Sequence, residues 1–266
     1  MRLFKCSNII AVVTTAVFLV AVSAARADWF PGDTYKMHYP QLPDPTGWDV
    51  NFTAPKVLAD DWMCTETGPV NDIHFWFSFR QGQPVPISSI HLSIHSDVPV
   101  SPTNPFSHPG SLLWSRDFLP SDVAILYPWG SGPQGWYDPN TGLAIRPDHS
   151  LFGQVNVRIP DTANPFIQQV SNIYWLDISV VLASGQTGQI GWKSSKDHFN
   201  DDAVWGDYNA AGGVDQWHEL RDPFTGESMD LAFVITTVPE PTGAAILGVG
   251  AALLLGWVRG RRQIRR

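Results

Sequence analysis

The stretch that decides the fold is Ile73-His74-Phe75-Trp76-Phe77-Ser78-Phe79-Arg80, which is followed after a turn by Ser88-Ser89-Ile90-His91-Leu92-Ser93-Ile94-His95. Apolar side chains alternate with mostly polar ones from Ile73 onward in the first segment and from Ile90 onward in the second. This period of two residues places alternate side chains on opposite faces of a β-strand. Both segments are therefore predicted to be half-buried strands, and the turn Gln81-Gly82-Gln83-Pro84 predicts that they pair as a hairpin.

Strand-like segments continue along the chain, and no stretch of three helical turns carries an apolar stripe. Seven further strands are expected within residues 56–64, 112–118, 123–127, 151–159, 173–182, 190–193 and 231–236. Turn-forming residues such as Asp138-Pro139-Asn140-Thr141-Gly142 separate most of them. Residues 56–237 are therefore predicted to form an all-β, antiparallel β-sandwich of jelly-roll-like type. Residues 28–55 contain five prolines and are predicted to be an extended lead-in without regular structure.

The N-terminal residues 1–27 have the pattern of a secretory signal peptide. Arg2 and Lys5 precede an apolar run over residues 9–22, and Ala25-Arg26-Ala27 supplies small residues on both sides of a cleavage position. The apolar run is short for a bilayer span. We therefore expect export of the chain, with Asp28 as the first mature residue.

The C-terminal residues 238–266 have three consecutive parts. Pro239-Glu240-Pro241 precedes an apolar segment over residues 242–258, and the chain then ends in Arg259, Arg261, Arg262, Arg265 and Arg266. Seventeen helical residues would reach about 26 Å, which is enough for a thin bilayer core. The segment is predicted to be a transmembrane helix, with the arginines on the cytoplasmic side and the large domain outside.

This three-part tail resembles the PEP-CTERM sorting signal, and all three parts stand in order over about a tenth of the chain. The resemblance implies a Gram-negative bacterial host and processing by an exosortase near the Pro-Glu-Pro motif. It also implies delivery to the cell surface or to an exopolysaccharide matrix.

Two shorter motifs, Ala59-Asp60-Asp61-Trp62 and Tyr174-Trp175-Leu176, resemble secreted bacterial sandwich modules that often precede this tail. They imply the fold and carry no implied activity.

The charge of the exported part excludes one class of partner. Between residues 28 and 238 the chain carries 9 basic and 24 acidic residues, a net charge of about −15. Such a domain repels phosphate backbones, which argues against nucleic-acid binding. Cys64 would be the single cysteine left after removal of the signal peptide, so no intrachain disulfide is expected.

One face of the predicted hairpin is a candidate glycan-binding surface. If the two strands pair, His74, Trp76 and Arg80 lie beside His91 and His95. An aromatic plane can stack on a sugar ring, and polar side chains can bond its hydroxyls. The other interpretation is an ordinary amphipathic sheet face that is covered by a loop or exposed to solvent.

A second candidate site is a calcium site. Asn200, Asp201, Asp202 and Asp207 place four oxygen-bearing side chains in eight residues, and Gly206 permits a bent loop. Calcium takes six to eight oxygen ligands. Asp60 and Asp61 could add two more, although the spacing is not that of an EF-hand.

Known catalytic motifs are missing from the sequence. It has no Gly-x-Ser-x-Gly, no His-Glu-x-x-His, no P-loop and no dinucleotide fingerprint. The function expected is therefore a non-catalytic structural or glycan-binding component of the surface or exopolysaccharide matrix. Two alternatives stay open: a polysaccharide hydrolase or lyase, and a protein-adhesive module.

Overall fold

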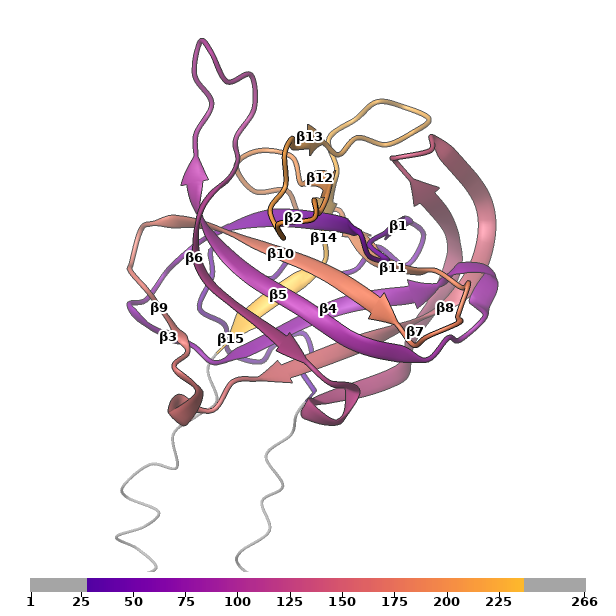
Figure 1. Ribbon diagram of the computed structural model, residues 1–266, viewed down its shortest axis with the longest axis horizontal. Coiled ribbons are helices and arrows are strands. Elements are labelled where there is room, and N and C mark those ends of the chain that lie inside the picture. Colours follow the sequence, from indigo (N-terminus) through magenta and orange to yellow (C-terminus); the bar gives the residue numbers. More distant parts are fainter. Residues whose placement is uncertain (1–27, 237–266) are drawn as a thin grey trace, which may run out of the picture.

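Two β-sheets face each other in the computed structural model of the chain, which describes residues 28–236 (Figure 1). The seven-stranded sheet has the spatial order β14 (Asp230–Leu231), β11 (Ile190–Ser195), β1 (Trp48–Asn51), β7 (Val123–Asp138), β8 (Leu143–Arg158), β4 (Asp72–Phe79) and β15 (Phe233–Thr236). The six-stranded sheet has the order β13 (His218–Glu219), β12 (Val204–Asp207), β2 (Lys56–Met63), β10 (Ile173–Leu182), β5 (Ile87–Val98) and β6 (His108–Phe118).

The remaining elements are short. A two-stranded ribbon pairs β3 (Gly68–Val70) with β9 (Phe166–Gln168), and three 3₁₀ turns are η1 (Arg80–Gly82), η2 (Pro120–Asp122) and η3 (Asp161–Ala163). Residues 28–236 contain no helical elements other than these three 3₁₀ turns, and none of the three is long or apolar enough to cross a bilayer. The predicted signal peptide and the predicted membrane helix over residues 242–258 lie outside the described residues.

An aromatic core fills the space between the two sheets. Trp62 of β2 and Phe233 of β15 meet edge to face, with 6.4 Å between ring centroids, although they belong to different sheets. Phe75 and Trp192, from β4 and β11, pack 6.0 Å apart in the same core. Full burial of one such side chain contributes about 1.5–3 kcal/mol. The prediction of an all-β sandwich is thus confirmed.

The predicted lead-in over residues 28–55 is wrong in one part. Trp48–Asn51 form β1, which is antiparallel to β11 and parallel to β7 within the seven-stranded sheet. The sequence had predicted purely antiparallel sheets, and the parallel pairing of β1 with β7 departs from that prediction. Prolines at positions 45 and 55 flank this segment but leave its own amide groups free to join the ladder.

The predicted hairpin between residues 73–80 and 88–95 is also wrong. β4 pairs with β8 on one side and with β15 and β11 on the other, whereas β5 pairs with β10 and β6 in the opposite sheet. Both edges of β4 are therefore occupied. The connection through η1 and residues 83–86 crosses from one sheet to the other, and Pro84 and Pro86 in it have no amide hydrogen to donate to a hairpin ladder.

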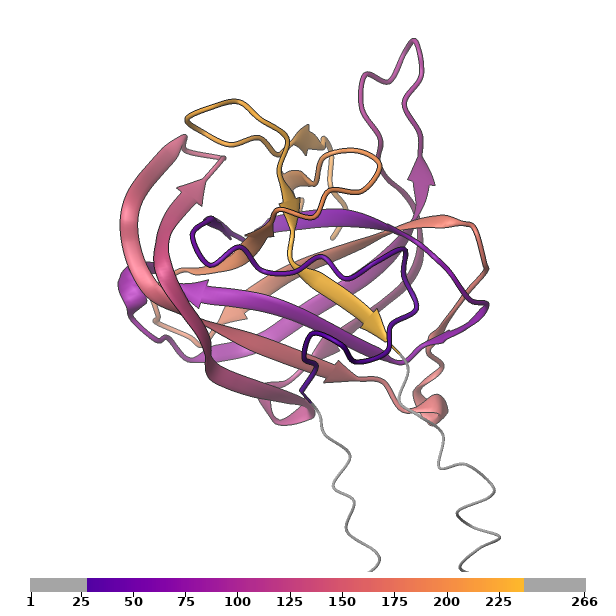
Figure 2. The same cartoon turned by 180° about the vertical axis from the view of Figure 1, so that it is seen from behind.

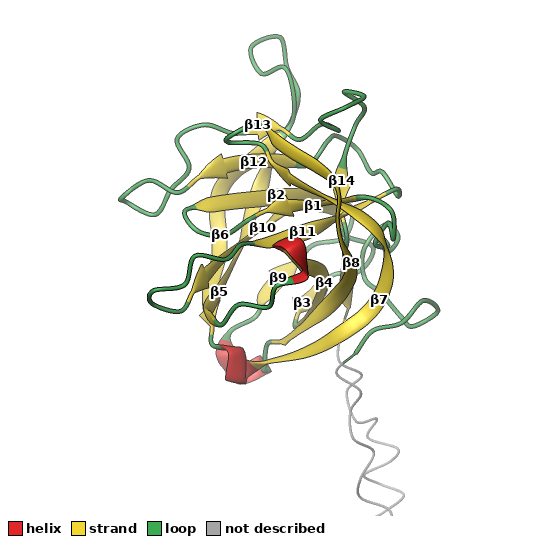
Figure 3. Ribbon diagram, turned by 90° about the vertical axis from the view of Figure 1, so that its right-hand side faces the viewer, coloured by secondary structure: helices red, strands yellow, loops and turns green. Residues whose placement is uncertain are grey.

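The long hairpin of β7 and β8 curls back onto the rest of its sheet (Figure 3). Near its base β8 pairs with β4, and near its tip β7 pairs with β1, which continues through β11 to β4. These five strands, β4, β8, β7, β1 and β11, close a ring of hydrogen-bonded neighbours, which we call the strand ring. A long hairpin can bend this far because its register shifts at three places.

The described chain begins and ends on one side of the molecule, at the lower edge of Figures 1 and 2. The connection between β5 and β6, together with β12 and β13, lies on the opposite side. The fold therefore separates the two chain ends from the face described next.

Candidate functional site

A groove of about 1220 Å³ lies on the face of the six-stranded sheet that points away from the core. Its floor comes from β5 and β10, where His91, Ser93 and His95 alternate with the core residues Ile90, Leu92 and Ile94. Its walls come from the β5–β6 connection and from residues 205–221, which include β12 and β13. The alternation seen in the sequence thus decides which side chains of β5 face the groove.

Aromatic rings line much of the groove. Trp205 stacks on His218, with ring centroids 4.4 Å apart and planes 25° from parallel. Tyr208 meets His91 edge to face at 5.7 Å, and Trp217 and Phe106 add two further half-buried rings. Flat aromatic surfaces beside polar groups are a typical lining for ligands that present both apolar and hydroxyl faces.

His95 forms the centre of a polar network on the groove floor. Its Nδ1 lies 3.1 Å from the carbonyl oxygen of Gly110, and its Nε2 lies 3.0 Å from Asp177 Oδ2 and 2.8 Å from Ser93 Oγ. Burial alone would lower the pKa of His95, but the hydrogen bond and charge of Asp177 outweigh burial and raise it. Both ring nitrogens face acceptors, so the imidazolium form satisfies both.

The same three side chains do not form a nucleophilic triad. Ser93 and Asp177 both contact Nε2 of His95, whereas a triad places the carboxylate on the opposite ring nitrogen. The Ser93 hydroxyl donates to Asp177, so its proton is not directed at a neutral histidine nitrogen. Tyr208 Oη also donates to Asp177, at 3.2 Å. The network orders the groove floor and does not activate a nucleophile.

The candidate glycan-binding residues divide into two groups. His91 and His95 line the groove, as a sugar-binding role requires. His74 and Trp76 are buried in the other sheet, where Trp76 packs edge to face against Trp29 at 6.1 Å and against Trp129 at 5.4 Å. Arg80, in η1, donates to Gln189 Oε1 at 2.5 Å. The structure therefore does not bring the five residues onto one face.

Several residues of the groove were not predicted from the sequence. Trp205 lies within the segment considered only for calcium binding, Tyr208 and Trp217 lie after it, and Asp177 comes from a predicted strand. In the predicted strand over residues 173–182, Asp177 already lies on the opposite face of the sheet from Leu176 and Ile178. Trp217 has no comparable signal, because it lies in an irregular segment before a two-residue strand.

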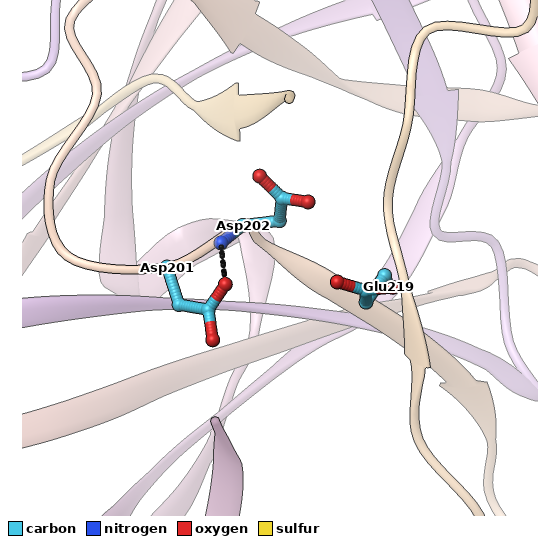
Figure 4. A group of neighbouring side chains, drawn as sticks. All are labelled: Asp201, Asp202 and Glu219. Carbon is cyan, nitrogen blue, oxygen red and sulfur yellow. Dashed lines mark hydrogen bonds between the residues drawn. The ribbon is translucent and has the colours of Figure 1, made fainter. Parts of the chain in front are cut away.

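The candidate calcium residues are also divided. Asp201 and Asp202 lie beside Glu219, and one ligand atom from each lies within 4.8 Å of the others (Figure 4). Arg221 Nη2 already bridges this group, at 2.8 Å from Asp202 Oδ2 and 2.9 Å from Glu219 Oε1. A guanidinium thus supplies the positive charge that a metal ion would bring there.

The other two calcium candidates point elsewhere. Asn200 Nδ2 donates to Asp61 Oδ2 at 2.6 Å, whereas Asp207 accepts from Asn140 at 2.6 Å. Asp61 is fully buried, and its Oδ1 finds no hydrogen-bond partner among the described residues. Burial raises the pKa of Asp61, and the charges of Asp230 and Asp97 raise it further against the opposing bond from Asn200.

The fold and the groove define an all-β sandwich domain with one open, aromatic-lined face. The family model described as "Domain of unknown function (DUF7901)" matches residues 37–236, and the chain belongs to this family. No curated protein and no solved structure matches the chain.

Proposed function

We propose that this chain is an exported surface or matrix protein whose jelly-roll-like sandwich binds a glycan in the groove without cleaving it. In this proposal the Pro239-Glu240-Pro241 tail directs sorting by an exosortase, as its resemblance to PEP-CTERM signals implies, and the bound glycan belongs to the exopolysaccharide. The observation that carries the binding proposal is the groove itself, where Trp205, Tyr208 and Trp217 lie beside the network of His95 and Asp177.

The chemistry of the lining favours a neutral glycan. Indole and phenol rings offer flat apolar surface for the C–H face of a sugar, while the exposed side chains of Arg221 and Gln216 offer donors and an acceptor for hydroxyls. An anionic chain would meet the net charge of about −15 carried by residues 28–238.

The position of the groove fits attachment through the C-terminus. The described chain ends on the side opposite β12 and β13, two of the elements that line the groove (Figure 1). A domain held at that end would present the groove away from its attachment.

The carboxylates of the groove argue against the alternative of a hydrolase or lyase. Glycoside hydrolysis requires a pair of carboxyl groups, one of which must act as a general acid. Asp177 accepts bonds from Ser93, His95 and Tyr208, Glu219 is paired with Arg221, and Asp215 accepts from Asn209 at 2.6 Å. The three carboxylates that line the groove are thus all engaged in contacts within the chain.

Isothermal titration of the full chain with neutral polysaccharides tests the binding proposal. Heat of binding that is lost in Trp217→Ala and retained in Tyr35→Ala would support it, since Tyr35 is an exposed aromatic residue away from the groove. The absence of heat with every polysaccharide would overturn it. Release of shorter oligosaccharides during the titration would support the hydrolase or lyase instead, and cell binding that free glycan cannot compete would support a protein adhesin.

We further propose a structural calcium ion next to Asp61, whose buried and unpartnered Oδ1 would be one oxygen ligand. Asn200, whose Nδ2 donates to Asp61 Oδ2, would supply a second oxygen once its amide group turns over. Calcium binding would favour the ionised carboxylate that burial alone disfavours. We expect the thermal unfolding midpoint to rise in calcium relative to chelator, and Asp61→Asn to abolish the difference. Asp207→Asn should retain it, because Asp207 bonds to Asn140. An unchanged midpoint in the wild type would exclude the ion.

A further inference from the structure

The strand ring encloses a buried lysine next to a buried aspartate. Asp49 of β1 and Lys193 of β11 are register partners on adjacent antiparallel strands. Lys193 Nζ lies 3.2 Å from Asp49 Oδ2, and both side chains have 0% exposure. Lys193 Nζ also lies 5.5 Å from the centre of the Phe152 ring, so part of the surroundings of the amine is apolar.

A histidine joins this pair and completes a short relay. His149 Nε2 lies 2.9 Å from the same Asp49 Oδ2, and His149 Nδ1 lies 2.9 Å from Asp148 Oδ2. The His149 side chain is fully buried. Both of its nitrogens therefore face carboxylates, which is the arrangement of a protonated imidazole. Within the described chain, Asp49 Oδ1 has no hydrogen-bond partner.

Burial changes the reactivity of this group. A buried ion pair is stabilised little over its neutral form, because both charges lose their hydration. Burial lowers the pKa of Lys193 despite the nearby Asp49, which favours the neutral, nucleophilic amine. Burial alone would raise the pKa of Asp49, but the charges of Lys193 and His149 outweigh burial and hold the pKa below its ordinary value, so the carboxyl group becomes neutral only when it takes a proton from Lys193. A proton shift from Lys193 to Asp49 makes both groups neutral and leaves the total number of protons unchanged.

We propose that Asp49 and Lys193 join in an intramolecular isopeptide bond, formed by the folded chain itself with His149 as the proton carrier. The amine and the carboxyl group are held in contact, water is excluded from them, and a proton donor lies on the departing oxygen Oδ2. This proximity replaces the encounter of two free reactants, which is the costly part of amide formation in solution.

The reaction balances without an added reagent. Lys193 Nζ attacks Asp49 Cγ, so the Nζ–Cγ bond forms and the Cγ–Oδ2 bond breaks. Of the three ammonium protons, one stays on the amide nitrogen and two leave with Oδ2 as water. One of these two reaches the oxygen directly, and the other replaces the proton that His149 Nε2 donates to Oδ2. Nothing is oxidised or reduced, and His149 ends in its starting form.

Such a bond would connect parts of the chain that are far apart in sequence. Residues 49 and 193 lie on neighbouring strands, and β1 belongs to a segment flanked by prolines. Residues 28–236 contain a single cysteine, Cys64, which is free, so no disulfide bond within them fixes this part of the fold. A covalent link restricts the unfolded chain in the same way that a disulfide does, but a reducing agent cannot break it.

Peptide mapping of the full chain tests the proposal directly. Trypsin digestion of the denatured protein should give residues 37–56 joined to residues 159–196, lighter by one water than the two peptides together, because a linked Lys193 is not cleaved. Lys56, at the end of the first peptide, serves as an internal control. It pairs with Asp138 at 3.4 Å but is partly exposed, so it should form no amide bond and trypsin should cleave after it. Finding the wild type only as peptides 37–56 and 159–193 would overturn the proposal.

Variants separate the roles of the three residues. Lys193→Met should remove the linked product, and His149→Gln should leave most of the protein unlinked while keeping both reacting groups. Lys196→Gln is the matched control, because Lys196 is exposed on the surface and pairs with Asp44 at 3.3 Å, so the link should be complete in this variant. Complete linkage in His149→Gln would overturn the role of His149 as the proton carrier. The mass of the wild-type product decides the bond itself, whether or not a variant folds.

Discussion

Strands β4 and β5 have the same pattern in the sequence and opposite surroundings in the structure. Both alternate apolar residues with histidine-bearing polar positions. On β4, the face with His74 and Trp76 is buried by Trp29, Trp129 and neighbouring strands. On β5, the face with His91 and His95 opens into the groove. Periodicity therefore shows which residues share a face, but it does not show what covers that face.

The largest expected effect of this difference is at Trp76. Trp76→Ala should lower the free energy of unfolding by about 3–5 kcal/mol, because it leaves a cavity between Trp29 and Trp129. Urea denaturation followed by circular dichroism measures the change. Trp76→Phe fills most of the space and should cost less. A loss of glycan affinity in folded Trp76→Phe would mean that the covered face takes part in binding after all.

His74 should give the next largest effect. Its ring lies 2.6 Å from Asn156 Oδ1 and 3.3 Å from Thr236 Oγ1, and it is almost fully buried. His74→Ala removes both contacts and leaves the buried Asn156 Oδ1 without this partner, so it should cost about 1–3 kcal/mol in the same denaturation experiment. The matched change on β5, His91→Ala, removes a half-exposed ring paired with the exposed Asp117 and should cost less. Equal losses would contradict the contrast between the two strands.

Trp217 should affect binding more than stability. Its ring lines the groove, so Trp217→Ala should weaken glycan binding by about five- to tenfold, corresponding to roughly 1 kcal/mol of stacking. Titration calorimetry measures the affinity. A variant that binds as tightly as the wild type would show that the proposed glycan contact does not include Trp217.

His95 should give the smallest effect, and one that depends on pH. Its pKa in the folded state is raised above the ordinary value of 6.5, so its contribution to stability is complete below that value. The contribution is lost as the pH rises through the raised pKa. His95→Gln should therefore lower the thermal midpoint most below pH 6.5, and the difference from the wild type should shrink as the pH rises through the raised pKa. An equal decrease at every pH would show that Asp177 does not hold His95 in its charged form.

The sequence predicted the strands better than it predicted their partners. Residues 173–182 were expected as a strand and form β10 with the same bounds. The predicted start of the strand at residue 151 was late, because β8 begins at Leu143 and continues through the bent hairpin. Strand pairing depends on contacts between distant residues, and the local pattern of β4 holds no information about β8, β11 or β15.

The candidate sites show the same limit. His91 and His95 were identified because strand parity is a local property. Trp217 and the contact of Asn200 with Asp61 depend on how irregular segments fold over the sheet, which no short pattern encodes. Asp49 was missed because its segment had been predicted to be an extended lead-in, although it lies on β1 next to Lys193.

The common side from which the described chain begins and ends also has a practical consequence (Figure 2). Domains with neighbouring ends tolerate insertion into a loop of another protein, since the host chain needs to separate only slightly. The sandwich could therefore be carried as a cassette within an unrelated scaffold. A reporter fused before Asp28 or after Thr236 would occupy the same side and leave the groove unobstructed.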